Sequence, residues 1–211
     1  MIGTRFFVMR LKLNFMIGVN LSPAKRRLSL GFSLIELIVS ISIIALLSAL
    51  FLANYRSTSR RTDLVMAAQT LVTDIRFAQA NALGLIKYDD EVPAGGWGIY
   101  ASAANVAANG NTGYTLFADE NDDQIMNTGE AAANLGGKRI DLPPNIVIDR
   151  LTLGTSEVSA ANITFLPPDP ITRLRGSAGT STVLEIRLRE KVNDTTKTVR
   201  VNFLGLVEVI D

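Results

Sequence analysis

Cysteine and histidine are both absent from the 211-residue chain. Without cysteine there can be no disulfide, no thiol nucleophile and no thiolate ligand for zinc or haem. Without histidine there can be no Ser-His-Asp triad and no imidazole ligand for a metal. These absences exclude many enzymes and metalloproteins, and they leave the hydrophobic core to stabilise whatever domain the chain forms.

Proline and glycine are absent between Phe32 and Leu83. The first part of this stretch, residues 32–54, is apolar except for one charged side chain, Glu36. A helix of roughly 20 apolar residues crosses the hydrocarbon core of a bilayer, about 30 Å thick, so the sequence predicts a membrane span here. A lone carboxylate in such a span costs a few kcal/mol unless it has a partner, and it therefore marks a functional position.

Acidic residues are absent from residues 1–31. This segment holds six of the 21 basic residues, which leaves 15 basic and 20 acidic residues, a net charge of −5, in the rest of the chain. A surface with this balance does not favour nucleic acid over its whole extent. A local basic patch remains an open alternative.

The basic run Lys25–Arg27 is followed by Gly31, Phe32 and Glu36. This pattern resembles the precursors of type IV pilins and type II secretion pseudopilins, in which a basic leader ends in glycine and the mature chain carries glutamate at its fifth position. The resemblance implies that a prepilin peptidase removes residues 1–31 by cutting after Gly31 and that the new amine of Phe32 is methylated. Glu36 would then neutralise the terminal amine of a neighbouring subunit, which offsets the cost of burying either charge.

The resemblance also implies a location and a set of partners. The chain would be a single-pass protein of the inner membrane with its C-terminal domain outside the cytoplasm, and it would join a pilus or pseudopilus after assembly. Its partners would be other pilin or pseudopilin subunits, the prepilin peptidase, the inner-membrane assembly platform and lipid. Two alternatives stay open: cleavage as an ordinary secretory signal peptide, and a plain single-pass anchor in which Glu36 is incidental.

A helical period continues beyond the span. Apolar residues recur at steps of three and four from Leu64 to Leu85, and polar residues occupy the opposite face. We expect one long helix that ends near Gly84, with residues 55–86 as its amphipathic continuation. Residues 87–211 would form a β-rich domain.

Short alternating or β-branched runs predict strands in this second part. They are Trp97–Tyr100, Tyr114–Phe117, Ile146–Ile148, Asn162–Phe165, Thr182–Leu188, Thr198–Phe203 and Leu206–Ile210. We expect an α+β, pilin-like fold with the long helix packed on an antiparallel sheet. The segments Arg76–Leu83, Gly96–Tyr100 and Val199–Val207 resemble the GspH/FimT group of minor pilins and pseudopilins.

An acidic loop runs from Asp119 to Glu130 and fits the spacing of an EF-hand calcium loop. Oxygen donors stand at positions 1, 3, 5, 7, 9 and 12 of that template, the seventh through a backbone carbonyl: Asp119, Asn121, Asp123, Ile125, Asn127 and Glu130. Gln124 occupies position six, where the template has glycine, and the sequence predicts no flanking helices. The loop is therefore either a divalent-cation site, calcium being the candidate cofactor, or a solvated hairpin loop.

Arg173 and Arg175 form a small basic segment that we expect to be a loop. Some FimT-like pilins bind DNA through arginines in a comparable late loop, and paired arginines beside a glycine suit phosphate contacts. Solvated charges are the alternative. The sequence as a whole predicts a minor pilin or pseudopilin that is not an enzyme, and the alternative is a membrane-tethered DNA-binding pilin for uptake.

Overall fold

The computed structural model describes residues 33–104, 110–127, 129–130, 139–168 and 171–211. The chain divides into two compact units, one ending at Ala45 and the other covering Leu46–Asp211. The described residues form one helix and eleven strands: α1 Leu34–Leu83, β1 Gly96–Ser102, β2 Gly113–Asp119, β3 Arg139–Asp141, β4 Ile146–Leu153, β5 Ser156–Val158, β6 Ala160–Leu166, β7 Ile171–Gly176, β8 Gly179–Ser181, β9 Val183–Glu190, β10 Thr195–Asn202 and β11 Val207–Ile210.

Helix α1 is long because no proline or glycine interrupts it. Its second half buries one face, with residues repeating every three or four positions: Leu64, Ala68, Leu71, Ile75, Ala78 and Ala82. Three of these are alanines, which let the helix backbone approach the strands closely. Leu85, which continues the same spacing, is 48% exposed because it lies beyond the end of the helix.

The helix ends in a left-handed turn. Leu85 has a φ of +50°, and the N–H of Ile86 donates to the carbonyl of Asn81 over 3.0 Å. This is the Schellman arrangement, which normally places glycine at the left-handed position. Here Gly84 comes one residue too early, and a leucine adopts the conformation at some cost in strain.

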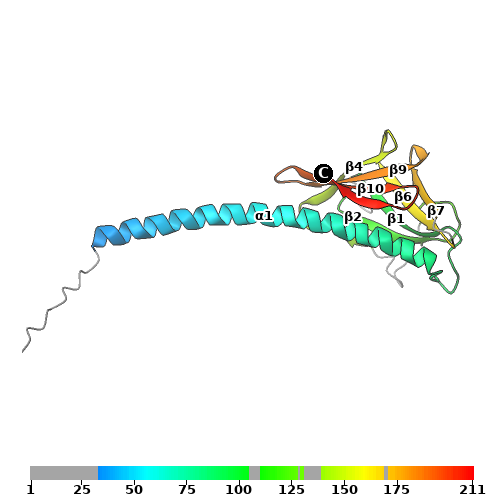
Figure 1. Ribbon diagram of the computed structural model, residues 1–211, viewed down its shortest axis with the longest axis horizontal. Helices are drawn as coiled ribbons and strands as arrows, with labels where there is room; N and C mark the ends of the chain where they lie inside the picture. Colours follow the sequence, from blue (N-terminus) through cyan, green and yellow to red (C-terminus); the bar gives the residue numbers. More distant parts are fainter. Residues whose placement is uncertain (1–32, 105–109, 128, 131–138, 169–170) are drawn as a thin grey trace, which may run out of the picture. The chain divides into compact units, whose positions relative to one another are not determined.

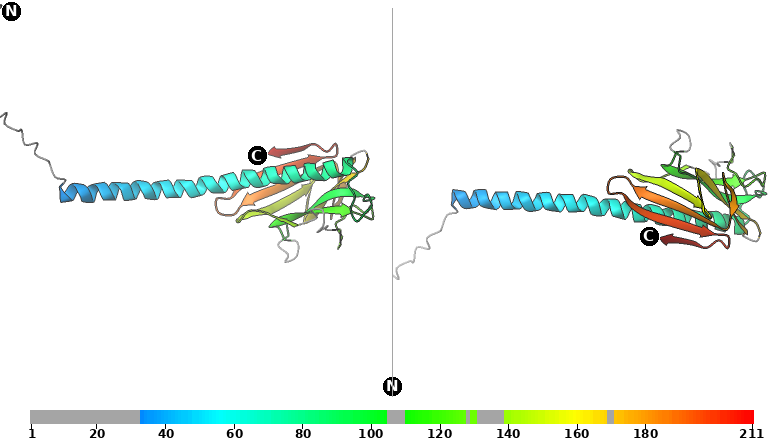
Figure 2. Two further views of the ribbon diagram at one scale, coloured as in Figure 1. Left: turned by 90° about the horizontal axis from the view of Figure 1, so that it is seen from below. Right: turned by 90° about the horizontal axis from the view of Figure 1, so that it is seen from above.

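The strands form two antiparallel sheets. The six-stranded sheet has the order β3-β2-β1-β6-β7-β8, and the five-stranded sheet has the order β11-β10-β9-β4-β5. Buried residues of α1 and of both sheets belong to one hydrophobic cluster, which includes Trp97, Phe165 and Leu188. Within the unit Leu46–Asp211, the last turns of α1 run alongside the strands (Figures 1 and 2).

The expected fold class is confirmed, and each of the seven predicted strands is present in whole or in large part. Strand β9 alternates buried and partly exposed residues along its length, as its sequence pattern predicts. The structure has two sheets where one was expected. The reason is that β1 pairs with both β2 and the distant β6, whereas β4 pairs with β9 and β5.

A buried tyrosine links the helix to the six-stranded sheet. The hydroxyl of Tyr114, in β2, donates to Oδ2 of Asp74, in α1, over 2.5 Å. Burial raises the pKa of Tyr114, and the bond to Asp74 raises it further, so the hydroxyl stays protonated and remains a donor. The bond therefore fixes the position of α1 on the sheet.

We predict that Tyr114→Phe lowers the free energy of unfolding by about 1.5–3 kcal/mol, the usual contribution of a hydrogen bond to a charged group. Thermal unfolding of the detergent-solubilised chain measures the effect. Tyr100→Phe is the matched control, because the described part of the chain shows no hydrogen-bond partner for that hydroxyl. Equal midpoints for the two variants would contradict the prediction.

Candidate functional site

The apolar start of α1 carries the first candidate residues. Leu34–Leu52 is a 19-residue segment long and apolar enough to cross a membrane, and none of it is buried within the structure. Glu36 lies in the first turn of the helix and is exposed. A carboxylate at a helix N-terminus interacts favourably with the helix dipole. Among the described residues, no lysine or arginine forms an ion pair with Glu36. Gly31 and Phe32 lie outside the described residues.

Two of the three serines in this segment, Ser40 and Ser42, donate hydrogen bonds within the helix. The hydroxyl of Ser40 donates to the carbonyl of Glu36 over 2.7 Å, and the hydroxyl of Ser42 donates to the carbonyl of Ile38 over 2.8 Å. A hydroxyl bonded within its own helix does not require water, so these serines are compatible with a lipid or protein environment. Glu36 carries the only charge among the residues of Leu34–Leu52.

The acidic loop follows β2 and begins with a buried carboxylate. Asp119 is 0% exposed, and its Oδ2 accepts the N–H of Gln124 over 2.8 Å. Its other oxygen, Oδ1, has no hydrogen-bond partner in the described structure. Burial raises the pKa of Asp119, and the N–H of Gln124 lowers it in part. One carboxylate oxygen is thus buried without compensation.

Hydrogen bonds within the loop order the remaining oxygen donors. The side chain of Asp123 accepts the N–H of Ile125 over 2.8 Å and the side-chain amide of Asn127 over 2.8 Å. Oε2 of Glu130 accepts the N–H of Asn127 over 2.7 Å. The amide of Asn127 is the main cause of the lowered pKa of Asp123, whereas burial raises the pKa of Glu130.

The sixth position of the loop has the conformation that the calcium template requires. Gln124 has a φ of +63°, the left-handed region that glycine usually supplies. The loop follows a strand, so the absence of a helix before it agrees with the sequence expectation. In the described part of the chain, however, no three Asp, Glu or His side chains already lie close enough together to hold a metal. The calcium site stays a prediction.

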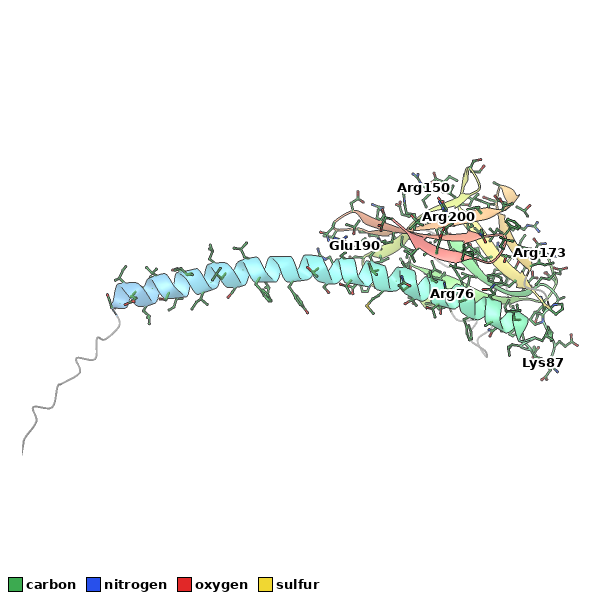
Figure 3. The ribbon with its side chains drawn as sticks, viewed as in Figure 1. Arg76, Lys87, Arg150, Arg173, Glu190 and Arg200 are labelled. Atoms are coloured by element: carbon green, nitrogen blue, oxygen red, sulfur yellow. The ribbon has the colours of Figure 1, made fainter. Side chains whose placement is uncertain are left out.

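The expectation that Arg173 and Arg175 lie in a loop is wrong. Both are in strand β7, which pairs with β6 and alternates buried Thr172 and Leu174 with the two arginines. The prolines at positions 167, 168 and 170 favour a turn, so the alternating residues that follow them were not interpreted as a strand. Arg173 lies at the same end of the β-domain as Lys87, while Glu190 lies at the other end (Figure 3).

The structure brings the two candidate sites together. Nη1 of Arg173 forms an ion pair with Oδ1 of Asp122 over 2.7 Å, and Nη1 of Arg175 donates to the carbonyl of Asp123 over 2.6 Å. Both guanidinium groups thus have partners in the acidic loop. This arrangement reduces the positive potential available to a phosphate backbone, and DNA contact stays a prediction without support from these contacts.

Two further residues that position the loop were not found from the sequence. Oδ1 of Asn162, in β6, accepts the N–H of Met126 over 3.1 Å, and the hydroxyl of Tyr88 donates to the carbonyl of Gly129 over 3.1 Å. Both come from segments about 40 residues away along the chain. The sequence carries no local signal for such contacts, because they depend on strand pairing.

An apolar N-terminal helix followed by antiparallel sheets defines an α+β fold of the pilin-like class. A family model described as the prokaryotic N-terminal methylation motif matches residues 26–52, a motif typical of type IV pilins and pseudopilins. The match contains Gly31, Phe32 and Glu36. A search of curated proteins found no match, and a search of solved structures found none.

Proposed function

We propose that this chain is a minor subunit of a type IV pilus or of a type II secretion pseudopilus. The observation that carries the proposal is the methylation motif at residues 26–52, which lies over a helix whose apolar part carries a single charge, Glu36. The motif supports processing by a prepilin peptidase, with cleavage after Gly31 and methylation of Phe32. The apolar helix supports a membrane anchor before assembly.

In this proposal the subunit acts through assembly and not through catalysis. Before assembly, Leu34–Leu52 holds the chain in the inner membrane, and the β-domain faces away from the cytoplasm. The assembly platform then moves the helix from lipid into a bundle of like helices. There the charge of Glu36 pairs with the terminal amine of a neighbouring subunit, because neither charge is stable alone in an apolar bundle.

The sequence resemblance to the GspH/FimT group supports, within this proposal, a minor subunit that is assembled into the filament or initiates it. The alternative function, DNA binding for uptake, has weaker support because Arg173 and Arg175 contact Asp122 and the backbone of Asp123. A net charge of −5 after removal of the leader also repels the phosphate backbone.

Recovery of the chain in sheared filaments tests the proposal. We expect the wild-type chain in the filament fraction as well as in the inner membrane, and we expect an unprocessed chain confined to the membrane when the prepilin peptidase is deleted. A chain that is absent from filaments and pseudopili, with processing unaffected by the deletion, would exclude the proposed function.

A further inference from the structure

We propose that the loop Asp119–Glu130 binds one calcium ion through the oxygens of Asp119, Asn121, Asp123, Asn127 and Glu130 and the carbonyl of Ile125. The bound ion would stabilise the β-domain whether or not the chain enters a filament. The proposal starts from the buried carboxylate of Asp119, which has Oδ1 without a partner in the described structure. A buried anionic oxygen needs a donor or a cation, and no described Lys or Arg forms an ion pair with Asp119.

The surroundings hold this carboxylate inside the loop. The backbone N–H of Gly95 donates to the carbonyl of Asp119 over 2.8 Å, and a side chain at Gly95 would overlap the Asp119 carboxylate. The N–H of Gln124 holds Oδ2 from the loop side. The carboxylate of Asp119 thus lies between Gly95 and the backbone of Gln124, at the start of the loop.

A second buried carboxylate lies at the other end of the loop. Glu130 is 5% exposed, and its carbonyl accepts the N–H of Ala118 over 3.2 Å, which holds it beside the end of β2. Two acidic groups buried in one loop repel each other, and a divalent cation between them would remove that repulsion.

The arginines hold the outside of the loop without occupying the proposed ligands. Arg173 pairs with Asp122, at position four of the template, where no ligand is required. Arg175 contacts the carbonyl of Asp123 and leaves the carboxylate to the amides of Asn121 and Asn127. The two arginines thus hold the loop on β7. The carboxylate of Asp123 accepts hydrogen bonds from the uncharged side-chain amides of Asn121 and Asn127.

The ligand set favours calcium over magnesium. It offers six oxygen-bearing residues, within the six to eight oxygen ligands that calcium takes, whereas magnesium demands near-ideal octahedral geometry and retains several waters. Because three carboxylates do not yet converge, binding has to draw Asp123 toward Asp119 and Glu130. This ordering weakens affinity, and we expect a dissociation constant of about 10⁻⁴ to 10⁻³ M, the range of extracellular calcium modules.

Thermal unfolding of the full chain in detergent tests the site. With 10 mM calcium we expect the midpoint to rise by roughly 3 to 10 °C, and with 10 mM magnesium we expect little change. Asp119→Asn should abolish the calcium shift. Glu120→Gln is the matched control, because it removes the same charge from an exposed position next to Asp119 that is not a proposed ligand, and it should keep the shift.

Terbium luminescence gives an independent measurement of cation binding. It uses the wild-type chain, so misfolding of a variant cannot affect the result. Trp97, the one tryptophan of the chain, pairs in register with Ala118, the residue before Asp119. Excitation of Trp97 should sensitise bound terbium, and millimolar calcium should displace it. Absence of both a calcium shift and displaceable terbium emission would overturn the proposal, as would a calcium shift of normal size in Asp119→Asn.

Discussion

Replacing Glu36 by alanine is expected to leave cleavage after Gly31 intact and to reduce the amount of the chain in sheared filaments by about tenfold or more. Loss of one member of a buried ion pair costs about 3–5 kcal/mol, because the other charge is left without compensation. In the proposed filament, the uncompensated charge would be the terminal amine of a neighbouring subunit. In lipid, before assembly, the variant loses only an unpaired carboxylate, so membrane insertion should not suffer.

The matched control is Ser40→Ala in the same apolar segment. It removes the hydroxyl that donates to the carbonyl of Glu36 but leaves the carboxylate in place. Quantitative blots of membrane and sheared fractions compare the two variants with wild type. If the Glu36 variant enters filaments at wild-type levels, the carboxylate has no role in pairing subunits.

The substitution Leu71→Ala is expected to lower the free energy of unfolding of the β-domain by about 2–5 kcal/mol. Leu71 is 0% exposed on the face of α1 that packs on the sheets, and it belongs to the central hydrophobic cluster. A leucine truncated there leaves a cavity that the surrounding strands cannot fill. Since domains of this size have a total stability of about 5–15 kcal/mol, the loss is a large part of the whole.

Leu83→Ala is the matched control for this second prediction. It makes the same chemical change in the same helix, but Leu83 is 51% exposed at the last position of α1. Fluorescence of the buried Trp97 follows thermal unfolding in detergent, and the Leu71 variant should unfold on the order of 5–15 °C below wild type while the control stays within a few degrees. Equal midpoints would show that the helix does not pack on the sheets as described.

The sequence predicted α1 well because the signal is local. The lack of proline and glycine and the spacing of Leu64, Ala68, Leu71 and Ile75 describe one helix with one buried face. The division into two sheets could not be predicted, since it depends on the pairing of Trp97 with Phe165, far apart along the chain. Strand pairing of this kind is set by tertiary packing and not by local propensity.

The acidic loop, too, could be predicted only in part from the sequence. The spacing of Asp119, Asp123 and Glu130 suggested calcium ligands, but nothing in the spacing indicated that Asp119 is buried. Nor did it indicate that Gln124 adopts the conformation of a glycine. Both depend on contacts with strands that lie elsewhere in the chain, such as the bond from Met126 to Asn162.

The most direct test of the pilin assignment is mass spectrometry of the N-terminal peptide of the native protein. We predict a peptide that begins at Phe32 and is one methyl group heavier than its unmodified form, because residues 26–52 match the prokaryotic N-terminal methylation motif. An intact leader, or a mature chain that begins near Asn54, would contradict the assignment.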